Sequence, residues 1–284
     1  MQSLLTYIRR GLRYIKNGPE VVLQHPEIKV SVSYTHPNNL LKGKKVLITG
    51  GSRGIGFAMA KKFVSEGAIV CITGRNETLL AEKARELGCS YICADLQRND
   101  LLEEIIIRAD ELLGGINCLV NNAGISLHEG NIMNVTEEKY DAQFQTNLKA
   151  AYFLSKYFIE LVKSKKTAIT YNLLFVSSER GTYVDDLPYG ITKNAINCLV
   201  RGLSKRVIRD GIRVNAVAPG VTATDLIGYG DNETLYYPAN MSKRLYLPDE
   251  IAEVASFLLS DVSMCLSGQV LTCDEGRSVN SYFQ

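Results

Sequence analysis

The sequence predicts an α/β fold built on a parallel β-sheet with helices on both faces. Short apolar runs alternate along the chain with longer stretches whose apolar residues recur at helical spacing. Strands separated by helices of this length pair through right-handed crossovers, so they run parallel. The predicted strands are 45–48, 69–73, 90–93, 118–120, 172–176, 212–217 and 270–273.

The first predicted strand runs directly into a glycine-rich turn at 49–56, and a helix expected to end near Glu66 follows. Ile55, Met59 and Phe63 are spaced for one face of that helix. Glycines here let the backbone turn tightly and let phosphates approach the N–H groups at the helix start. The spacing is Gly-x-x-x-Gly-x-Gly, not the common Gly-x-Gly-x-x-Gly. The turn indicates either a phosphate site or a structural turn.

A tyrosine and a lysine four residues apart, Tyr189 and Lys193, follow the serine pair Ser177-Ser178. Positions i and i+4 share a helix face, so the ammonium group can lie beside the phenol. The pKa of a free tyrosine is about 10, and a neighbouring cation lowers it. We therefore expect Lys193 to depress the Tyr189 pKa and make the phenol a usable proton donor and acceptor.

Three further motifs occur in order along the chain: Asn121-Asn122-Ala123-Gly124 after a strand, Asn147 within a helix expected over 137–163, and Pro219-Gly220-Val221-Thr222-Ala223-Thr224 after another strand. Tyr189 and Lys193 lie in a second long helix, expected over 187–210. Together these motifs resemble the classical short-chain dehydrogenase/reductase family over about 41–276. The resemblance implies a doubly wound Rossmann fold with a seven-stranded parallel sheet. The general pattern is most similar to β-ketoacyl-carrier-protein reductases and related hydroxysteroid or sugar-type reductases.

The resemblance implies a catalytic set of four residues. Tyr189 would donate a proton to a carbonyl oxygen, and Ser178 would hydrogen-bond that oxygen. Lys193 would bind the cofactor ribose and lower the tyrosine pKa, and Asn147 would hold a water molecule that refills the proton relay. These roles suit hydride transfer to a ketone, because negative charge that develops on the oxygen must be stabilised and then protonated.

The same resemblance implies the cofactor site. Asp95 and Leu96 would border the adenine, although Asp95 is also a candidate helix cap. The Thr222 backbone and the Thr224 hydroxyl would contact the nicotinamide side. The implied cofactor residues are Gly50, Ser52, Arg53, Gly54, Ile55, Gly56, Arg75, Asp95, Leu96, Asn122, Ala123, Gly124, Tyr189, Lys193, Pro219, Gly220, Thr222 and Thr224.

Charge at the end of the second strand favours NADP(H). A relative that prefers NAD commonly carries an acidic residue there to hold the ribose 2′-hydroxyl. Here Arg75 follows that strand, and Arg53 lies in the glycine turn. Two guanidinium groups near one ribose suit a 2′-phosphate. The alternative is that both are solvated surface arginines.

The sequence departs from the family pattern in two places. Tyr189 follows Ser178 by eleven positions, which is fewer than usual, so the loop at 179–188 should be short. Of the two serines we expect Ser178, the second, to be the catalytic one. Near the C-terminus, Asp274-Glu275-Gly276 replaces the common Asp-Gly-Gly, which can alter a turn or a subunit contact.

Composition agrees with one cytoplasmic catalytic domain at 41–284. The chain has 284 residues, of which 46% are hydrophobic, enough for one sizeable core. The seven cysteines are odd in number and lack C-x-x-C spacing, as expected of reduced thiols. His25, His36 and His128 are isolated, so neither a zinc site nor a Ser-His-Asp triad is expected.

Residues 1–40 lie outside the resemblance, and their pattern predicts a basic amphipathic arm with a helix and a strand. Its apolar helical stripe is Leu4, Leu5, Ile8, Leu12 and Ile15. Up to Gly43 the chain has six basic and two acidic residues, so it carries +4, and the remainder carries −2 to give the total of +2. Three interpretations stay open: packing on the domain or a neighbouring subunit, peripheral membrane or acidic-partner contact, and a cleaved transit peptide.

The segment 226–247 is expected to cover the substrate, and it contains Tyr229, Tyr236, Tyr237, Met241 and Tyr246. These side chains either recognise the substrate or pack the segment shut. The resemblance implies an NADPH-dependent oxidoreductase acting on a small carbonyl or alcohol substrate, as a homodimer or homotetramer. The alternative function is a non-catalytic NADP(H)-binding sensor or scaffold. Nucleic-acid binding is not expected, because the net charge outside the arm is slightly negative.

Overall fold

The computed structural model of the chain describes residues 39–165, 170–230 and 234–279. The predictions for the N-terminal arm fall almost entirely outside the described residues. Within those residues, no helix is both long enough and apolar enough to span a membrane. The same part of the chain has no group of three or more His, Cys, Asp or Glu side chains placed to hold a metal ion.

Seven parallel strands form one sheet in the order β3-β2-β1-β4-β5-β6-β7. Their bounds are β1 Lys45–Ile48, β2 Ile69–Gly74, β3 Ser90–Cys93, β4 Cys118–Asn121, β5 Tyr171–Val176, β6 Ile212–Pro219 and β7 Val270–Cys273. All seven predicted strands are present. The near-continuous apolar runs arise because both faces of the sheet are covered, and every residue of β5 and β6 is buried. The strand order reverses between β1 and β4, where sheets of this type bind ligands.

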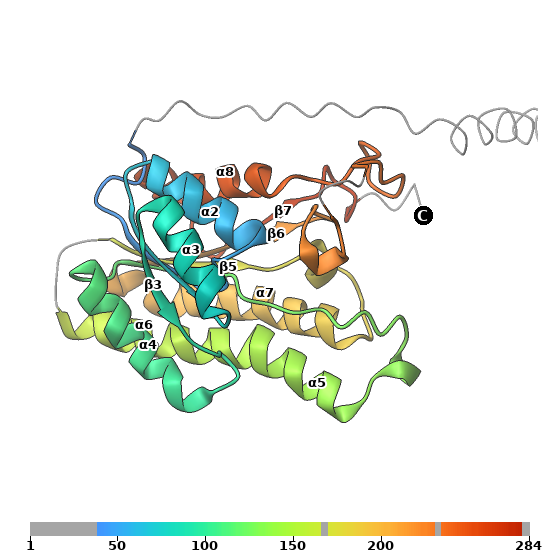
Figure 1. Cartoon of the computed structure of the whole chain (residues 1–284), viewed down its shortest axis with the longest axis horizontal. Coiled ribbons are helices and arrows are strands. Elements are labelled where there is room, and N and C mark those ends of the chain that lie inside the picture. The colour runs from blue at the N-terminus through green and yellow to red at the C-terminus, as the bar shows by residue number, and fades with distance from the viewer. Residues whose placement is uncertain (1–38, 166–169, 231–233, 280–284) are drawn as a thin grey trace, which may run out of the picture.

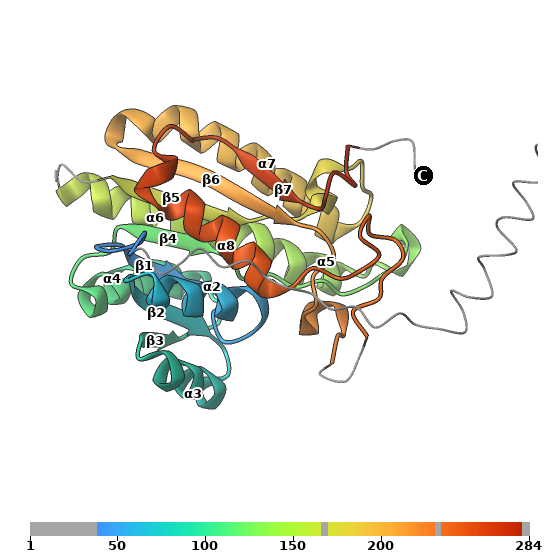
Figure 2. The same ribbon diagram turned by 90° about the horizontal axis from the view of Figure 1, so that it is seen from above.

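Helices cover both faces of the sheet, as predicted (Figures 1 and 2). On one face, the core contains Met59 of α2, Leu80 of α3 and Ile251 of α8. On the other, it contains Ile105 of α4, Phe158 of α6 and Val200 of α7. The helix bounds are α2 Gly54–Ser65, α3 Glu77–Leu87, α4 Leu102–Leu113, α5 Glu137–Gln143, α6 Ala150–Lys165, α7 Pro188–Val207 and α8 Pro248–Leu259.

The single long helix expected over 137–163 is interrupted. Helix α5 passes into a π-helical segment, Phe144–Lys149, before α6 continues. Asn147 lies in this segment, and its side chain hydrogen-bonds both the N–H and the C=O of Ile125. The wider turn coincides with a polar side chain held against the end of β4, where π-bulges often mark functional sites. Periodicity predicted the helix but could not show this local widening.

Candidate active site

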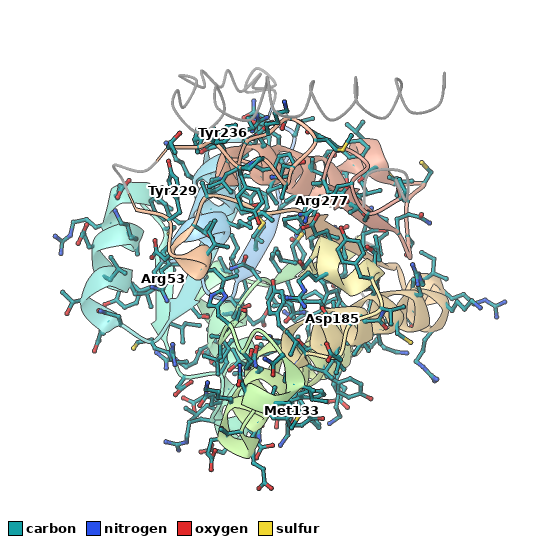
Figure 3. The ribbon with its side chains drawn as sticks, turned by 90° about the vertical axis from the view of Figure 1, so that its right-hand side faces the viewer. Arg53, Met133, Asp185, Tyr229, Tyr236 and Arg277 are labelled. Carbon is teal, nitrogen blue, oxygen red and sulfur yellow. The ribbon has the colours of Figure 1, made fainter. Side chains whose placement is uncertain are left out.

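The predicted site residues gather at the carboxyl end of the strands. Figure 3 faces this edge, with Arg53 and Asp185 on opposite sides of the view and Tyr229 and Tyr236 above them. The glycine turn follows β1, Gly124 follows β4, the serine pair follows β5, and Pro219 ends β6. Residues distant in sequence therefore meet at one edge of the sheet.

The glycine turn is packed so closely that two of its glycines leave no space for a side chain. A Cβ at Gly56 would lie 2.2 Å from the backbone oxygen of Gly50, and one at Gly51 would lie 2.6 Å from Ile72 Cγ2. Gly50 and Gly54 also have φ of +66° and +54°, which glycine tolerates best. Arg53 stands at the N-cap of α2 without a side-chain capping bond. The first N–H groups of α2 therefore begin at this edge, in a position that favours an anion.

Asn122 holds the glycine turn against the end of β4. Its Nδ2 donates to the backbone oxygens of Thr49 (2.8 Å) and Gly50 (3.0 Å). The Thr49 hydroxyl oxygen accepts from the backbone N–H groups of Asn122 and Ala123, both at 3.0 Å. Thr49 was absent from the predicted site, although its place at the end of β1 is the signal that could have identified it. The Asn122 side chain positions the turn.

Asn147, Lys193 and Gly124 form one cluster. A Cβ at Gly124 would lie 3.4 Å from both Asn147 Oδ1 and Lys193 Nζ. Asn147 Nδ2 also donates to Thr192 Oγ1 at 3.2 Å, a partner that the sequence did not reveal. Lys193 is 4% exposed and donates to the backbone oxygen of Val176 at 2.8 Å. Burial lowers the pKa of Lys193 to about 8.

The two serines have different environments. The Ser177 hydroxyl lies 2.6 Å from Asn197 Oδ1 and 3.2 Å from the Lys193 backbone oxygen, so it braces α7. The Ser178 hydroxyl accepts from the Arg180 backbone N–H at 3.2 Å, and its interaction with the Tyr189 phenol lowers the pKa of that phenol. Ser178 is therefore the serine that interacts with Tyr189. Its role as the catalytic serine stays a prediction.

The expectation that Lys193 depresses the Tyr189 pKa is wrong for this structure. Burial raises the pKa of Tyr189, and this effect outweighs the hydrogen bond with Ser178 and the charge of Arg180, which both lower it. Lys193 Nζ lies 5.7 Å from the centre of the Tyr189 ring. The phenol therefore stays protonated at neutral pH, as a proton donor must.

The two arginines expected at the ribose are not equivalent. Arg53 Nη1 lies 3.3 Å from Asp225 Oδ2, and both side chains are well exposed. Arg75 is exposed and directly follows β2. Asp95 accepts from the backbone N–H of Gln97 at 3.0 Å, which is a local turn contact. Arg98, not Asp95, stands at the N-cap of the helical turn that follows, so Asp95 is not the helix cap that was the alternative. Leu96 is buried in the core.

The loop after β6 is bonded to the end of the segment 226–247, which is expected to cover the substrate. Residues 222 and 246 form a parallel bridge, and a Cβ at Gly220 would lie 2.6 Å from Tyr246 Cε2. The Thr222 and Thr224 hydroxyls bond backbone oxygens of the same loop. The Tyr246 side chain is 4% exposed and lies against Gly220, so it packs this segment against the loop after β6. Tyr229 and Tyr236 stand nearer the surface (Figure 3).

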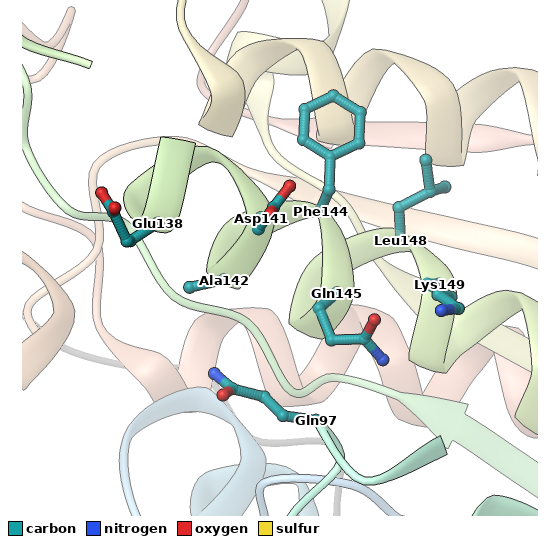
Figure 4. Close-up of a pocket in the computed structure, with 8 residues that line it drawn as sticks. All are labelled: Gln97, Glu138, Asp141, Ala142, Phe144, Gln145, Leu148 and Lys149. Atoms are coloured by element: carbon teal, nitrogen blue, oxygen red, sulfur yellow. The ribbon is translucent and has the colours of Figure 1, made fainter. Parts of the chain in front are cut away.

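A surface hollow of about 670 Å³ lies along α5 and the π-helical segment (Figure 4). Its lining residues are Gln97, Glu138, Asp141, Ala142, Phe144, Gln145, Leu148 and Lys149. None of the predicted catalytic or cofactor residues is among them.

Comparison with known proteins agrees with this geometry. A protein-family profile described as "Enoyl-(Acyl carrier protein) reductase" matches residues 50–278. The chain is 35% identical over 250 residues to the 3-oxoacyl-[acyl-carrier-protein] reductase FabG of Chlamydia muridarum, a match that covers 85% of this chain and 100% of the relative.

Two solved structures are also similar. A short chain dehydrogenase from Burkholderia cenocepacia in complex with NADP has a TM-score of 0.75 and 28% identity, with 84% of this chain and 98% of that chain covered. A 3-ketoacyl-(acyl-carrier-protein) reductase from Brucella melitensis complexed with NADH has a TM-score of 0.76 and 29% identity, with 84% of this chain and 100% of that chain covered.

Proposed function

Because the chain belongs to the short-chain dehydrogenase/reductase family of oxidoreductases, we propose that it reduces a ketone to a secondary alcohol with NADPH and catalyses the reverse oxidation with NADP⁺. The observation that carries the proposal is the convergence of Asn147, Ser178, Tyr189 and Lys193 at the strand ends, beside a glycine turn and Gly124. A sensor or scaffold would not need all four groups.

The residues fit a dinucleotide. Gly50 and Gly56 keep the turn free of side chains, and the start of α2 favours the pyrophosphate. Gly124 leaves space beside Lys193 for the ribose and nicotinamide. When bound, the reduced nicotinamide supplies the hydride to the carbonyl carbon.

The protein groups stabilise and protonate the oxygen of the substrate. The Ser178 hydroxyl donates a hydrogen bond to that oxygen as negative charge develops, and the Tyr189 phenol then transfers its proton. The raised Tyr189 pKa keeps the phenol protonated and so suits the reductive direction. The Lys193 ammonium group would hold the ribose hydroxyls of the bound cofactor, and Asn147 would anchor a water molecule through which the proton is replaced.

Arg75 supports a preference for NADPH. It follows β2 where an acidic residue would bind the 2′-hydroxyl of NADH. Arg53 can join it only by leaving Asp225, an exposed pair worth little. We expect NADPH to bind at least tenfold more tightly than NADH, measured by fluorescence titration. Arg75→Ala should reduce this ratio, whereas Arg206→Ala on the exposed surface of α7 should not. Equal dissociation constants for the two cofactors would refute the preference.

Ketone reduction is tested by NADPH oxidation over a panel of acyl thioesters, steroids, quinones and keto-sugars, each offered as the ketone and as its α,β-unsaturated analogue. The matching family profile carries the description of an enoyl reductase, so the two reactions must be separated. The Ser178 and Tyr189 pair suits an oxygen that receives a proton, which favours the ketones. Turnover of the unsaturated analogues alone would replace this proposal with enoyl reduction.

A further inference from the structure

The turn after β7 carries a glutamate in a conformation that favours glycine. Glu275 has φ of +53°, in the left-handed region that L side chains adopt at a cost. Its carboxylate accepts a hydrogen bond from the Ser242 backbone N–H at 2.9 Å. Glycine at this position would relieve the strain but would lose the acceptor. The strained backbone thus accompanies a contact that only a side chain can make.

Two residues further on, Arg277 joins two other segments. Its Nη1 lies 2.8 Å from Glu179 Oε1 and 3.4 Å from Asn240 Oδ1. Glu179 directly follows Ser178 and is 4% exposed. Burial raises the pKa of Glu179, and the Arg277 charge opposes that effect. Arg277 therefore stabilises a buried carboxylate next to the proposed catalytic serine while contacting the segment that covers the site.

The contact of Glu275 with Ser242 and the contact of Arg277 with Asn240 both fall on one compact turn. We name this turn, residues 240–246, the covering turn. Asn240 is buried, and its Nδ2 donates to the Arg244 backbone oxygen at 2.6 Å. Arg244 pairs with Glu250 at 2.7 Å, which fastens the far end of the turn to α8. A displacement of Asn240 would therefore be transmitted along the whole covering turn.

The turn after β7 is itself rigid. Asp274 is buried, and its two carboxylate oxygens accept from the backbone N–H groups of Gly276 (3.0 Å) and Ser278 (2.7 Å). The Arg277 N–H also donates to the Asp274 backbone oxygen at 3.1 Å. Glu275 and Arg277 consequently project from a fixed base. In Figure 3, Arg277 lies between Tyr236 and Asp185 at the site edge.

We infer that Glu275 and Arg277 are positioning residues that hold the covering turn against the Ser178 loop and so shape the substrate end of the active site. The inference rests on the proposed function only in identifying that end with the substrate. Neither side chain takes part in proton transfer. Together they give the unusual Asp274-Glu275-Gly276 sequence a function.

Amide hydrogen exchange of the full-length protein tests the positioning without a substrate. Glu275→Gly and Arg277→Met should each speed exchange in peptides that cover 240–246 at least tenfold, while peptides of β4 and β5 stay unchanged. Arg206→Met, an exposed arginine of α7, is the matched control and should change exchange there less than twofold. Unchanged exchange of the covering turn in both variants would overturn the inference. Glycine suits the positive φ at position 275, so we expect the Glu275→Gly protein to fold and its exchange rates to be measurable.

Steady-state kinetics then test the link to the substrate. With a ketone that the wild-type protein reduces, both variants should raise KM at least fivefold and leave the NADPH dissociation constant within twofold. Arg277→Lys, which retains the charge beside Glu179, should recover part of this loss. If no ketone is reduced by the wild-type protein, the proposed function fails while the exchange result still decides the positioning. Faster exchange with an unchanged KM would refute the substrate-end assignment.

Discussion

Lys193 is a buried cation, and keeping it protonated lowers the free energy of unfolding of the protein. The pKa of a free lysine is about 10.4, and burial lowers that of Lys193 to about 8. Because the folded-state pKa lies below the unfolded one, the folded protein binds this proton less tightly. The charge therefore destabilises the fold by about 3 kcal/mol at neutral pH, and the cost disappears as pH rises from about 8 toward 10.5.

Lys193→Met should abolish turnover and yet be more stable than the wild-type protein at pH 7. Its advantage should shrink by about 2 kcal/mol between pH 7 and pH 9.5, because the wild-type lysine is deprotonated in the folded state at the higher pH. Urea denaturation of both proteins at the two pH values measures how the difference between their free energies of unfolding changes with pH. A stability difference that is the same at both pH values would contradict the assigned pKa.

The sequence predicted on which helices and strands individual residues lie better than it predicted their pKa shifts and contacts. The placement of Tyr189 and Lys193 on one helix, α7, follows from their spacing, and Ser178 rather than Ser177 interacts with Tyr189. The direction of the Tyr189 pKa shift was not predictable, because it depends on burial by neighbours from other segments. Likewise, the contact of Asn147 with Thr192 joins two helices that no local pattern connects.

An ion pair between Arg180 and Asp185 spans the short connection between β5 and α7, and Asp185 has space only because residue 190 is glycine. Arg180 Nε lies 2.7 Å from Asp185 Oδ2, and Asp185 Oδ1 accepts from the Leu187 backbone N–H at 3.0 Å. A Cβ at Gly190 would lie 2.7 Å from the Asp185 Cβ and nearer still to its carboxylate. The sequence predicted a short loop at this position, but the packing of Asp185 over Gly190 required the structure.

Gly190→Ala should destabilise the protein by about 1–3 kcal/mol, because the added methyl group displaces Asp185 and strains the loop. Gly202→Ala, in the same helix, is the matched control. Among the described residues, and apart from its own helix backbone, no atom lies within 4 Å of a Cβ there, so alanine should stabilise by roughly 0.5–1 kcal/mol. Urea denaturation gives both values. Equal changes in the free energy of unfolding for the two substitutions would show that crowding of Asp185 does not affect stability.

The sheet and the helices that cover it were predictable because several independent signals agree. Apolar runs gave every strand, and the order of the motifs indicated the doubly wound arrangement that the sheet adopts. The π-helical segment at Phe144–Lys149 was missed, since it depends on a contact between Asn147 and Ile125 across the site. The contact of Arg277 with Glu179 was missed for the same reason, because it joins residues 98 positions apart.

The most direct measurement of the central claim is NADPH oxidation with a reducible ketone by wild-type, Tyr189→Phe and Tyr140→Phe proteins. Tyr140 is an exposed tyrosine stacked on Phe144, so its variant controls for loss of a phenol hydroxyl. We predict that Tyr189→Phe lowers kcat/KM by roughly 10²–10⁴-fold, the range of a general acid, while Tyr140→Phe stays within twofold. Both should bind NADPH like the wild-type protein. If Tyr189→Phe retains more than a tenth of the wild-type kcat/KM, Tyr189 is not the proton donor.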